Sequence, residues 1–191
     1  MKNHSMVFDD FFKDPNETKK QINAAPMADE KYKDGVTYPN ITRLPADVVA
    51  EIATNMKTLV GPAFTPVLSF ARYSFKDTNP PHWAHSDREI AQFLALIYMN
   101  PDPEAEKSGT VCLRHKERGF EYHPESIEDQ KILLEHANEF EAWDMTFACP
   151  AKYNRCLILN ADLIHAAMGE YGSTREDGRL VISVFFNLVY Q

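Results

Sequence analysis

Two hydrophobic patterns divide the chain near residue 62. In the first part, apolar residues recur at helical spacing over 46–59, which predicts an amphipathic helix. Upstream, Asp14 followed by Pro15 is a typical helix start and predicts a shorter helix. The stretch 27–45 contains several turn-forming residues and predicts a loop. We therefore expect residues 1–62 to form a helical support.

After this point, short runs of β-branched and aromatic residues alternate with turn-forming residues. Many short strands at this spacing are typical of an antiparallel sandwich or jelly roll. The predicted strands lie at 67–75, 92–100, 110–115, 142–149, 155–160 and 179–190. One helix interrupts them and begins at an N-cap, Ser126. We expect residues 1–191 to form a single domain of the mainly β (α+β) class, with residues 63–191 as the jelly-roll core.

The composition is that of one soluble globular domain. The chain has 191 residues, of which 44% are hydrophobic and 25% are charged, and its formal net charge is −8. This acidic balance argues against nonspecific binding to nucleic acid or to anionic membranes. No apolar run approaches the roughly 20 residues of a membrane-spanning helix. We therefore expect neither nucleic acid nor a membrane as a partner.

The cysteines and the first residues indicate a reducing compartment. The three cysteines, Cys112, Cys149 and Cys156, are an odd number and have apolar neighbours, which predicts buried, reduced thiols. The first residues, MKNHSMVFDDFF, lack the pattern of a secretory signal peptide. The expected location is the cytoplasm.

The candidate chemistry begins with His85-Ser86-Asp87. On a strand, residues two positions apart point to the same side, so an imidazole and a carboxylate would share one face. These groups are two thirds of the two-histidine, one-carboxylate triad that holds non-haem Fe(II) and leaves coordination positions open. A solvent-facing polar strand edge is the alternative, because the pattern is short and its residues are common.

Two later residues can complete such a site. His165 has apolar neighbours, so it is either a buried ligand or a core histidine bonded to a backbone carbonyl. Arg179 begins the last predicted strand, and its planar fork suits the distal carboxylate of a cosubstrate such as 2-oxoglutarate. The alternative for Arg179 is a water-facing position beside Asp177. Ser183 has the same strand parity as Arg179 and is expected to face the same pocket.

This spaced set of residues resembles a known family. From about residue 66 to 189, the chain is similar to the 2-oxoglutarate/Fe(II)-dependent oxygenases, in particular to their prolyl-4-hydroxylase-like branch. The similarity rests on the segments ARYSFKDTNPPHWAHSD, FLALIYMN, SGT, KYNRCLILNADLIH and GRLVISVFF, in this order. The resemblance implies a double-stranded β-helix that uses Fe(II), 2-oxoglutarate as cosubstrate, and O2. The implied reaction hydroxylates an unactivated C–H bond and yields succinate and CO2. The implied substrate is a small molecule, a peptide or a protein, with a prolyl or other amino-acid residue among the candidates.

The resemblance also implies roles for individual residues. The implied iron ligands are His85, Asp87 and His165. Arg179 would bind the distal carboxylate of 2-oxoglutarate with help from the Tyr98 hydroxyl, and Tyr73 matches a family tyrosine near the iron and the cosubstrate. The pair Ser108-Gly109 departs from the family, which usually has two glycines there.

Two other functions are compatible with the same fold. A cupin-like metal enzyme that does not use 2-oxoglutarate would not need Arg179. A non-catalytic jelly-roll binding module would keep the histidines as structural residues. Binding of 2-oxoglutarate that depends on Arg179 distinguishes an oxygenase from the first alternative, and stoichiometric metal binding distinguishes it from the second.

Overall fold

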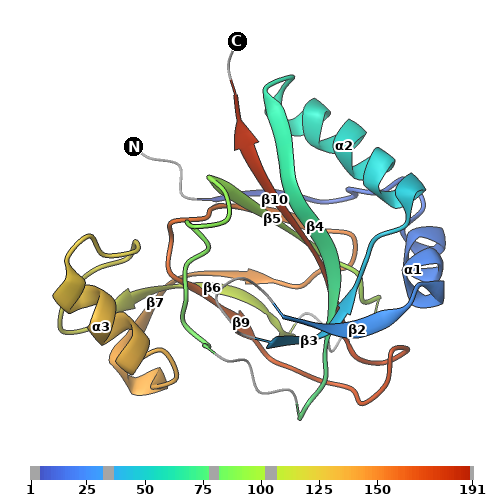
Figure 1. Ribbon diagram of the computed structural model, residues 1–191. Helices are drawn as coiled ribbons and strands as arrows, with labels where there is room; N and C mark the ends of the chain where they lie inside the picture. The colour runs from blue at the N-terminus through green and yellow to red at the C-terminus, as the bar shows by residue number, and fades with distance from the viewer. Residues whose placement is uncertain (1–4, 32–36, 78–81, 102–106, 190–191) are drawn as a thin grey trace.

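Two antiparallel β-sheets form the framework of the computed structural model (Figure 1). The structure describes residues 5–31, 37–77, 82–101 and 107–189. Within these residues, the large sheet has seven strands: β1 (Ser5–Phe8), β2 (Met27–Lys31), β3 (Thr37–Thr42), β4 (Phe64–Ser74), β5 (Phe93–Tyr98), β8 (Cys156–Asn160) and β10 (Arg179–Leu188). The small sheet has three described strands: β6 (Gly109–His115), β7 (Trp143–Pro150) and β9 (His165–Met168). The mainly β architecture expected from the sequence is confirmed.

The last strand of the chain lies inside the large sheet. The strand order is β1-β8-β5-β10-β4-β3-β2 in the large sheet and β7-β6-β9 in the small one. β10 pairs with β5 on one side and with β4 on the other. Arg179 is the first residue of β10 and lies opposite Ser74. The predicted strand start therefore places this arginine inside the sheet and not at its edge.

Helices cover the outer faces of the sheets (Figure 1). In the described part of the chain they are α1 (Pro15–Ala24), α2 (Ala46–Val60), α3 (Ile127–Glu135) and a short 3-10 turn, Phe140–Ala142. α1 and α3 begin at the predicted N-caps: the Asp14 carboxylate accepts a hydrogen bond from the Glu17 N–H at 3.0 Å, and the Ser126 hydroxyl accepts one from the Asp129 N–H at 3.1 Å. Both helix starts were therefore readable from the sequence.

The stretch 27–45, expected to be a loop, instead adds two strands to the large sheet. β3 pairs with β4, with Ile41 opposite Arg72 and Thr42 opposite Ala71. β2 pairs with β3 and is the last strand on that side of the sheet. The prediction was wrong because turn-forming residues indicate only a local backbone preference. Hydrogen bonding to a neighbouring strand, β4 for β3 and β3 for β2, stabilises the extended conformation despite that preference. The N-terminal part of the chain thus contributes strands as well as helices.

Three layers of buried side chains hold the sheets and helices together. The layer between the large sheet and helices α1 and α2 includes Ile22, Ile52, Met56, Tyr73, Ile182 and Phe186. The layer on the other face of the large sheet, toward the small sheet, includes Tyr98, Cys112, Leu157, Val181 and Phe185. The layer between the small sheet and α3 includes Val111, Leu133, Trp143 and Ala166. Side chains alternate along β10 between the first two layers, and we call the face that carries Val181 and Phe185 the inner face.

The cysteines match the sequence-based expectation. Cys112, Cys149 and Cys156 are buried, and none of them forms a disulfide. Among the described residues, no helix is both long enough and apolar enough to cross a membrane.

A cluster of charged residues joins the N-terminal segment to the turn before β8. The Asp9 carboxylate accepts hydrogen bonds from Lys152 Nζ at 2.8 Å and from Arg155 Nε at 2.7 Å. The hydrogen bond from Arg155, followed by that from Lys152, lowers the pKa of Asp9 to about 2. Because folding lowers this pKa, the stabilisation is fully present above the ordinary pKa of an aspartate and is lost as the pH falls through about 2.

We expect Asp9→Asn to lower the free energy of unfolding at neutral pH by no more than about 1 kcal/mol, because the ion pairs are partly exposed. As the pH falls to about 2, the wild type loses the same contribution, so the two proteins should converge. Urea denaturation across this pH range measures the difference. Asp10→Asn removes a charge from the neighbouring position and serves as the matched control. A difference of undiminished size at about pH 2 would contradict the ion-pair explanation.

Candidate metal centre

Three predicted site residues meet where the segment before β5 crosses the start of β9. The backbones of His85 and His165 exchange two hydrogen bonds, from His85 N to His165 O at 3.1 Å and from His165 N to His85 O at 2.8 Å. The Asp87 N–H donates to Ala161 O at 2.8 Å. One nitrogen or oxygen from each of His85, Asp87 and His165 lies within 4.8 Å of the other two. The first two residues sit in a bridged segment and not in a regular strand, yet their side chains still share one side.

Both imidazole rings use Nδ1 for a backbone hydrogen bond. Nδ1 of His85 lies 3.0 Å from the carbonyl oxygen of Trp83, and Nδ1 of His165 lies 2.9 Å from that of Leu163. A carbonyl oxygen can only accept a hydrogen bond, so Nδ1 carries the proton in each ring. In the neutral form of each ring, Nε2 then keeps its lone pair, which is the arrangement found in histidines that bind metals, whereas in the protonated form Nε2 of His165 donates to Asp87.

The electrostatics of the triad favour a bound cation. Burial raises the pKa of Asp87, but the hydrogen bond from His165 and the charges of both imidazoles outweigh it, so this pKa lies below its usual value. Burial, together with His165, lowers the pKa of His85. Burial also acts to lower the pKa of His165, but Asp87, whose Oδ2 lies 3.3 Å from its Nε2, raises this pKa overall. An ionised carboxylate beside two imidazoles is a suitable donor set for a divalent transition metal.

Arg179 is a buried cation with unused hydrogen-bonding capacity. Its Nη2 donates to the carbonyl oxygen of Gly109 at 3.0 Å. Its Nε is buried and has no hydrogen-bond partner among the residues that the structure describes. Burial lowers the pKa of the guanidinium, while Tyr98, Tyr171 and Glu170 act to raise it. A buried N–H without a partner is costly, so this group is suited to an anion that completes its hydrogen bonds.

Tyr98 and Ser183 lie on the same inner face as Arg179. Tyr98 lies opposite Val181, and its hydroxyl donates to Thr110 Oγ1 at 2.9 Å. Burial raises the pKa of Tyr98, so the phenol keeps its proton. Ser183 is half-buried and follows Val181 at the next position on this face. The structure therefore brings these three predicted cosubstrate residues to one side of the large sheet.

Tyr73 lies on the opposite face of the large sheet. Its ring packs in the layer below α1 and α2, and its hydroxyl donates to Asn23 Oδ1 in α1. The guanidinium carbon of Arg175 lies 5.0 Å from the centre of its ring. The structure thus does not bring Tyr73 to the triad. The inward position belongs to its neighbour Arg72, because side chains alternate along β4.

The sequence analysis missed two residues that the structure places near this site. Arg72 is close enough to the triad for its charge to lower the pKa of His85. Thr110 is buried and orients the Tyr98 hydroxyl. The alternation along β4 was the available signal for Arg72, since it places Arg72 and Tyr73 on opposite faces. No comparable signal pointed to Thr110.

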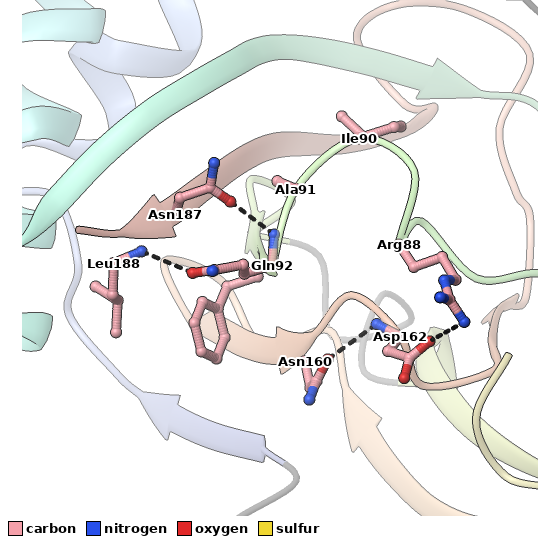
Figure 2. Close-up of a pocket in the computed structure, with 9 residues that line it drawn as sticks. Arg88, Ile90, Ala91, Gln92, Asn160, Asp162, Asn187 and Leu188 are labelled. Carbon is pink, nitrogen blue, oxygen red and sulfur yellow. Dashed lines mark hydrogen bonds and ion pairs between the residues drawn. The ribbon is translucent and has the colours of Figure 1, made fainter.

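A surface hollow of about 810 Å³ opens next to Arg88 and does not include the triad (Figure 2). Its polar groups are largely paired with one another. Arg88 Nη1 lies 3.6 Å from Asp162 Oδ1, and the Gln92 N–H donates to Asn187 Oδ1 at 2.8 Å. Asp162 Oδ1 accepts no hydrogen bond but is ion-paired with Arg88, and none of the lining residues is a buried cation like Arg179, so we do not assign the chemistry to the hollow.

Other histidines have structural contacts of their own. Ser86, between the first two triad residues, has its Oγ 2.8 Å from Nδ1 of His123. His115 Nε2 lies 2.8 Å from His136 Nδ1, and the His115 ring stacks on Phe120. These contacts account for the three histidines without a metal ion.

Solved structures share this fold at low sequence identity. HygX from Streptomyces hygroscopicus, with nickel and 2-oxoglutarate bound, gives a TM-score of 0.61 at 11% identity, over 98% of this chain and 84% of its own. The non-heme α-ketoglutarate-dependent epimerase SnoN from nogalamycin biosynthesis gives a TM-score of 0.58 at 15% identity, over 95% of this chain and 77% of its own. A prolyl hydroxylase from Trichoplax adhaerens gives a TM-score of 0.56 at 10% identity, over 97% of this chain and 84% of its own. It was solved in complex with a peptide fragment of the hypoxia-inducible factor oxygen degradation domain.

These similarities concern the fold. No protein-family model matches the sequence, and neither does any curated protein sequence. The chain has the double-stranded β-helix fold seen in these 2-oxoglutarate-dependent enzymes. The fold implied by the sequence resemblance is therefore confirmed.

Proposed function

We propose that this protein is an Fe(II)- and 2-oxoglutarate-dependent oxygenase that uses O2 to hydroxylate an unactivated C–H bond and releases succinate and CO2. The observation that carries the proposal is a His-Asp-His triad on the same fold as a buried arginine whose Nε has no hydrogen-bond partner among the described residues. The triad alone would also suit a cupin-like metal enzyme. Arg179 favours an oxygenase, because a buried guanidinium is stabilised by a carboxylate, and 2-oxoglutarate would supply one.

The triad residues fit the proposed metal. Nε2 of His85, Nε2 of His165 and a carboxylate oxygen of Asp87 would hold Fe(II) from one side and leave the other side open to ligands. Bound Fe(II) would supply the oxidative chemistry that decarboxylates 2-oxoglutarate and attacks the C–H bond. The carbonyl groups of Trp83 and Leu163 keep the rings in the tautomer that this binding requires.

The inner face fits the proposed cosubstrate. Arg179 would bind the distal carboxylate of 2-oxoglutarate with its unused Nε and a further N–H group. Tyr98, held by Thr110, lies close enough to interact with the charge of Arg179, and Ser183 faces the same side. Val181 and Phe185 make the surroundings apolar, which excludes water and strengthens the ion pair.

The reaction outcome and the location are further parts of the proposal. SnoN is described as an epimerase, so we base hydroxylation on the prolyl-hydroxylase-like order of motifs and not on the fold. HygX has been solved with hygromycin B and the Trichoplax enzyme with a peptide, which supports a small molecule or a peptide as the substrate class. Three buried thiols without disulfides are in keeping with a cytoplasmic location.

Substrate-free turnover tests the proposal. We expect purified protein with Fe(II), O2 and 2-oxoglutarate to form succinate slowly, because the triad and Arg179 suffice to bind the metal and the cosubstrate. Proton NMR follows succinate over time. A chelator should stop the reaction, and added Fe(II) should restore it. Absence of succinate from protein that binds Fe(II) stoichiometrically would contradict the proposal.

A further inference from the structure

Asn100 follows β5 closely, at the point where the pairing of β5 with β10 ends (Figure 1). β5 ends at Tyr98, and one residue further the Met99 N–H donates to Leu180 O at 3.0 Å. In a regular antiparallel ladder, the next N–H to face β10 belongs to residue 101. That residue is Pro101, which has no N–H. The ladder therefore cannot continue through the backbone to the start of β10.

The side chain of Asn100 supplies hydrogen bonds where the backbone cannot. Its Oδ1 accepts from the Leu180 N–H at 2.7 Å, and its Nδ2 donates to Gly178 O at 2.7 Å. These two groups belong to the peptide units on either side of the Arg179 Cα. The amide therefore fixes both peptide planes from which the Arg179 side chain projects. Because Asn100 is 5% exposed, water has little access to replace either bond.

The turn before Arg179 is held from the other side. The Gly178 N–H donates to Thr174 O at 2.7 Å, and the Thr174 N–H donates to Asp177 Oδ1 at 2.7 Å. A Cβ atom at Gly178 would lie 2.6 Å from Thr174 O, so the backbone is closely packed there. Arg179 thus enters the sheet from a fixed turn, and Asn100 sets the direction in which it continues.

We propose that Asn100 is a positioning residue for the cosubstrate, which holds the Arg179 guanidinium where the distal carboxylate of 2-oxoglutarate binds. The inference rests on the proposed function, in which Arg179 binds that carboxylate. The guanidinium ends a long side chain that donates to Gly109 O, and binding groups must be held within about 0.5 Å of the productive geometry. Without the amide, the Leu180 N–H and the Gly178 carbonyl lose buried partners, and the start of β10 would shift to regain hydrogen bonds.

The metal ligands do not depend on Asn100. The backbone hydrogen bonds described for the triad run between His85 and His165 and from Asp87 to Ala161. Removing the amide should therefore weaken cosubstrate binding and leave metal binding unchanged. A residue needed only for folding would affect both.

Isothermal titration calorimetry with 2-oxoglutarate on Ni(II)-loaded protein tests the inference without turnover. Asn100→Ala should bind 2-oxoglutarate about tenfold more weakly than the wild type, because the arginine is present but misplaced. Adding Asn100→Ala to Arg179→Met should cause no further loss, since Asn100 acts through Arg179. In substrate-free turnover with Fe(II), Asn100→Ala should raise the KM for 2-oxoglutarate and keep kcat close to the wild-type value.

Asn154→Gly is the matched control. Asn154 is also 5% exposed, and its amide also makes two backbone hydrogen bonds, from the Phe12 N–H at 2.8 Å and to Phe12 O at 2.9 Å. Glycine suits its φ of 62° and keeps its backbone N–H. The melting temperatures of Asn100→Ala and Asn154→Gly should fall by similar amounts, but the control should bind 2-oxoglutarate like the wild type. Equal losses of affinity in both variants would overturn the inference.

A measurement on the wild type keeps the inference testable if Asn100→Ala does not fold. In Zn(II)-loaded protein labelled with ¹⁵N at asparagine, the side-chain NH2 signals of Asn100 should shift when 2-oxoglutarate binds. They should not shift with 2-oxobutanoate, which lacks the distal carboxylate, and the signals of Asn154 should not respond to either acid. Asn100 signals that stay unchanged at saturating 2-oxoglutarate would overturn the inference.

Binding of 2-oxoglutarate to the wild type separates the inference from the proposed function. If the wild type binds 2-oxoglutarate and Asn100→Ala binds it equally well, only the inference fails. The inference also fails alone if Asn100→Ala weakens binding by the same factor in the Arg179→Met background. If the wild type binds no 2-oxoglutarate, the proposed function fails and the inference fails with it.

Discussion

Replacing Asp87 by alanine is expected to lower 2-oxoglutarate turnover by more than about 100-fold, since even groups that merely orient metal ligands contribute about 10–100-fold. Asp87 is the carboxylate of the triad, and its backbone N–H donates to Ala161 O at 2.8 Å, so the variant removes the proposed ligand and keeps this backbone hydrogen bond. The two remaining imidazoles supply no negative charge. Metal content after anaerobic loading and succinate formation should fall together, and His85→Ala should behave in the same way.

Ser86→Ala is the matched control for this prediction. Ser86 lies between the two proposed ligands in sequence, but its hydroxyl is within hydrogen-bonding distance of His123 Nδ1, at 2.8 Å. We expect the control to bind metal and to turn over 2-oxoglutarate close to the wild-type level. Undiminished turnover in Asp87→Ala would refute the triad. Equal losses in both variants would show that the whole segment was disturbed and not the ligand.

Replacing Arg179 by methionine is expected to raise the KM for 2-oxoglutarate by at least about 30-fold, because losing one partner of a buried ion pair costs about 2–5 kcal/mol. The side chain is 6% exposed, so water cannot take over its role. Arg179→Lys keeps the charge but loses the planar fork, and its KM should lie between those of the wild type and the methionine variant. Succinate formation at varied 2-oxoglutarate concentration gives these values.

Thermal stability separates this effect from a general loss of structure. In the absence of 2-oxoglutarate, Arg179→Met should be at least as stable as the wild type, because it removes a buried cation whose Nε has no partner among the described residues. With Ni(II) bound, 2-oxoglutarate should raise the melting temperature of the wild type and not that of the variant. An equal rise in both proteins would show that the cosubstrate does not bind Arg179.

Features that depend on local chemistry could be predicted from the sequence. Asp14 and Ser126 cap helices because each side chain accepts a hydrogen bond from a residue only three positions later. The spacing of His85 and Asp87 likewise suggested a shared side, and the structure brings both to His165. The pairing with His165 is not local, and only the order of family-like motifs pointed to it.

Features that depend on tertiary packing could not be predicted in this way. Alternation along β4 shows that Arg72 and Tyr73 face opposite sides of the sheet, but not which of them faces inward. The answer depends on which face α1 and α2 cover, and they cover the face that carries Tyr73. The sequence analysis missed β2 and β3 for a related reason. Pairing with neighbouring strands, and not the local preference of their own residues, gives these segments an extended structure.

A crystal structure with Mn(II) and 2-oxoglutarate tests the central claim most directly. The account predicts a metal bound by Nε2 of His85, Nε2 of His165 and a carboxylate oxygen of Asp87, with the distal carboxylate of 2-oxoglutarate on Arg179. It also predicts that Arg179 Nε, without a partner among the described residues, becomes a donor to that carboxylate. A metal held by other residues, or a distal carboxylate bound away from Arg179, would contradict the account.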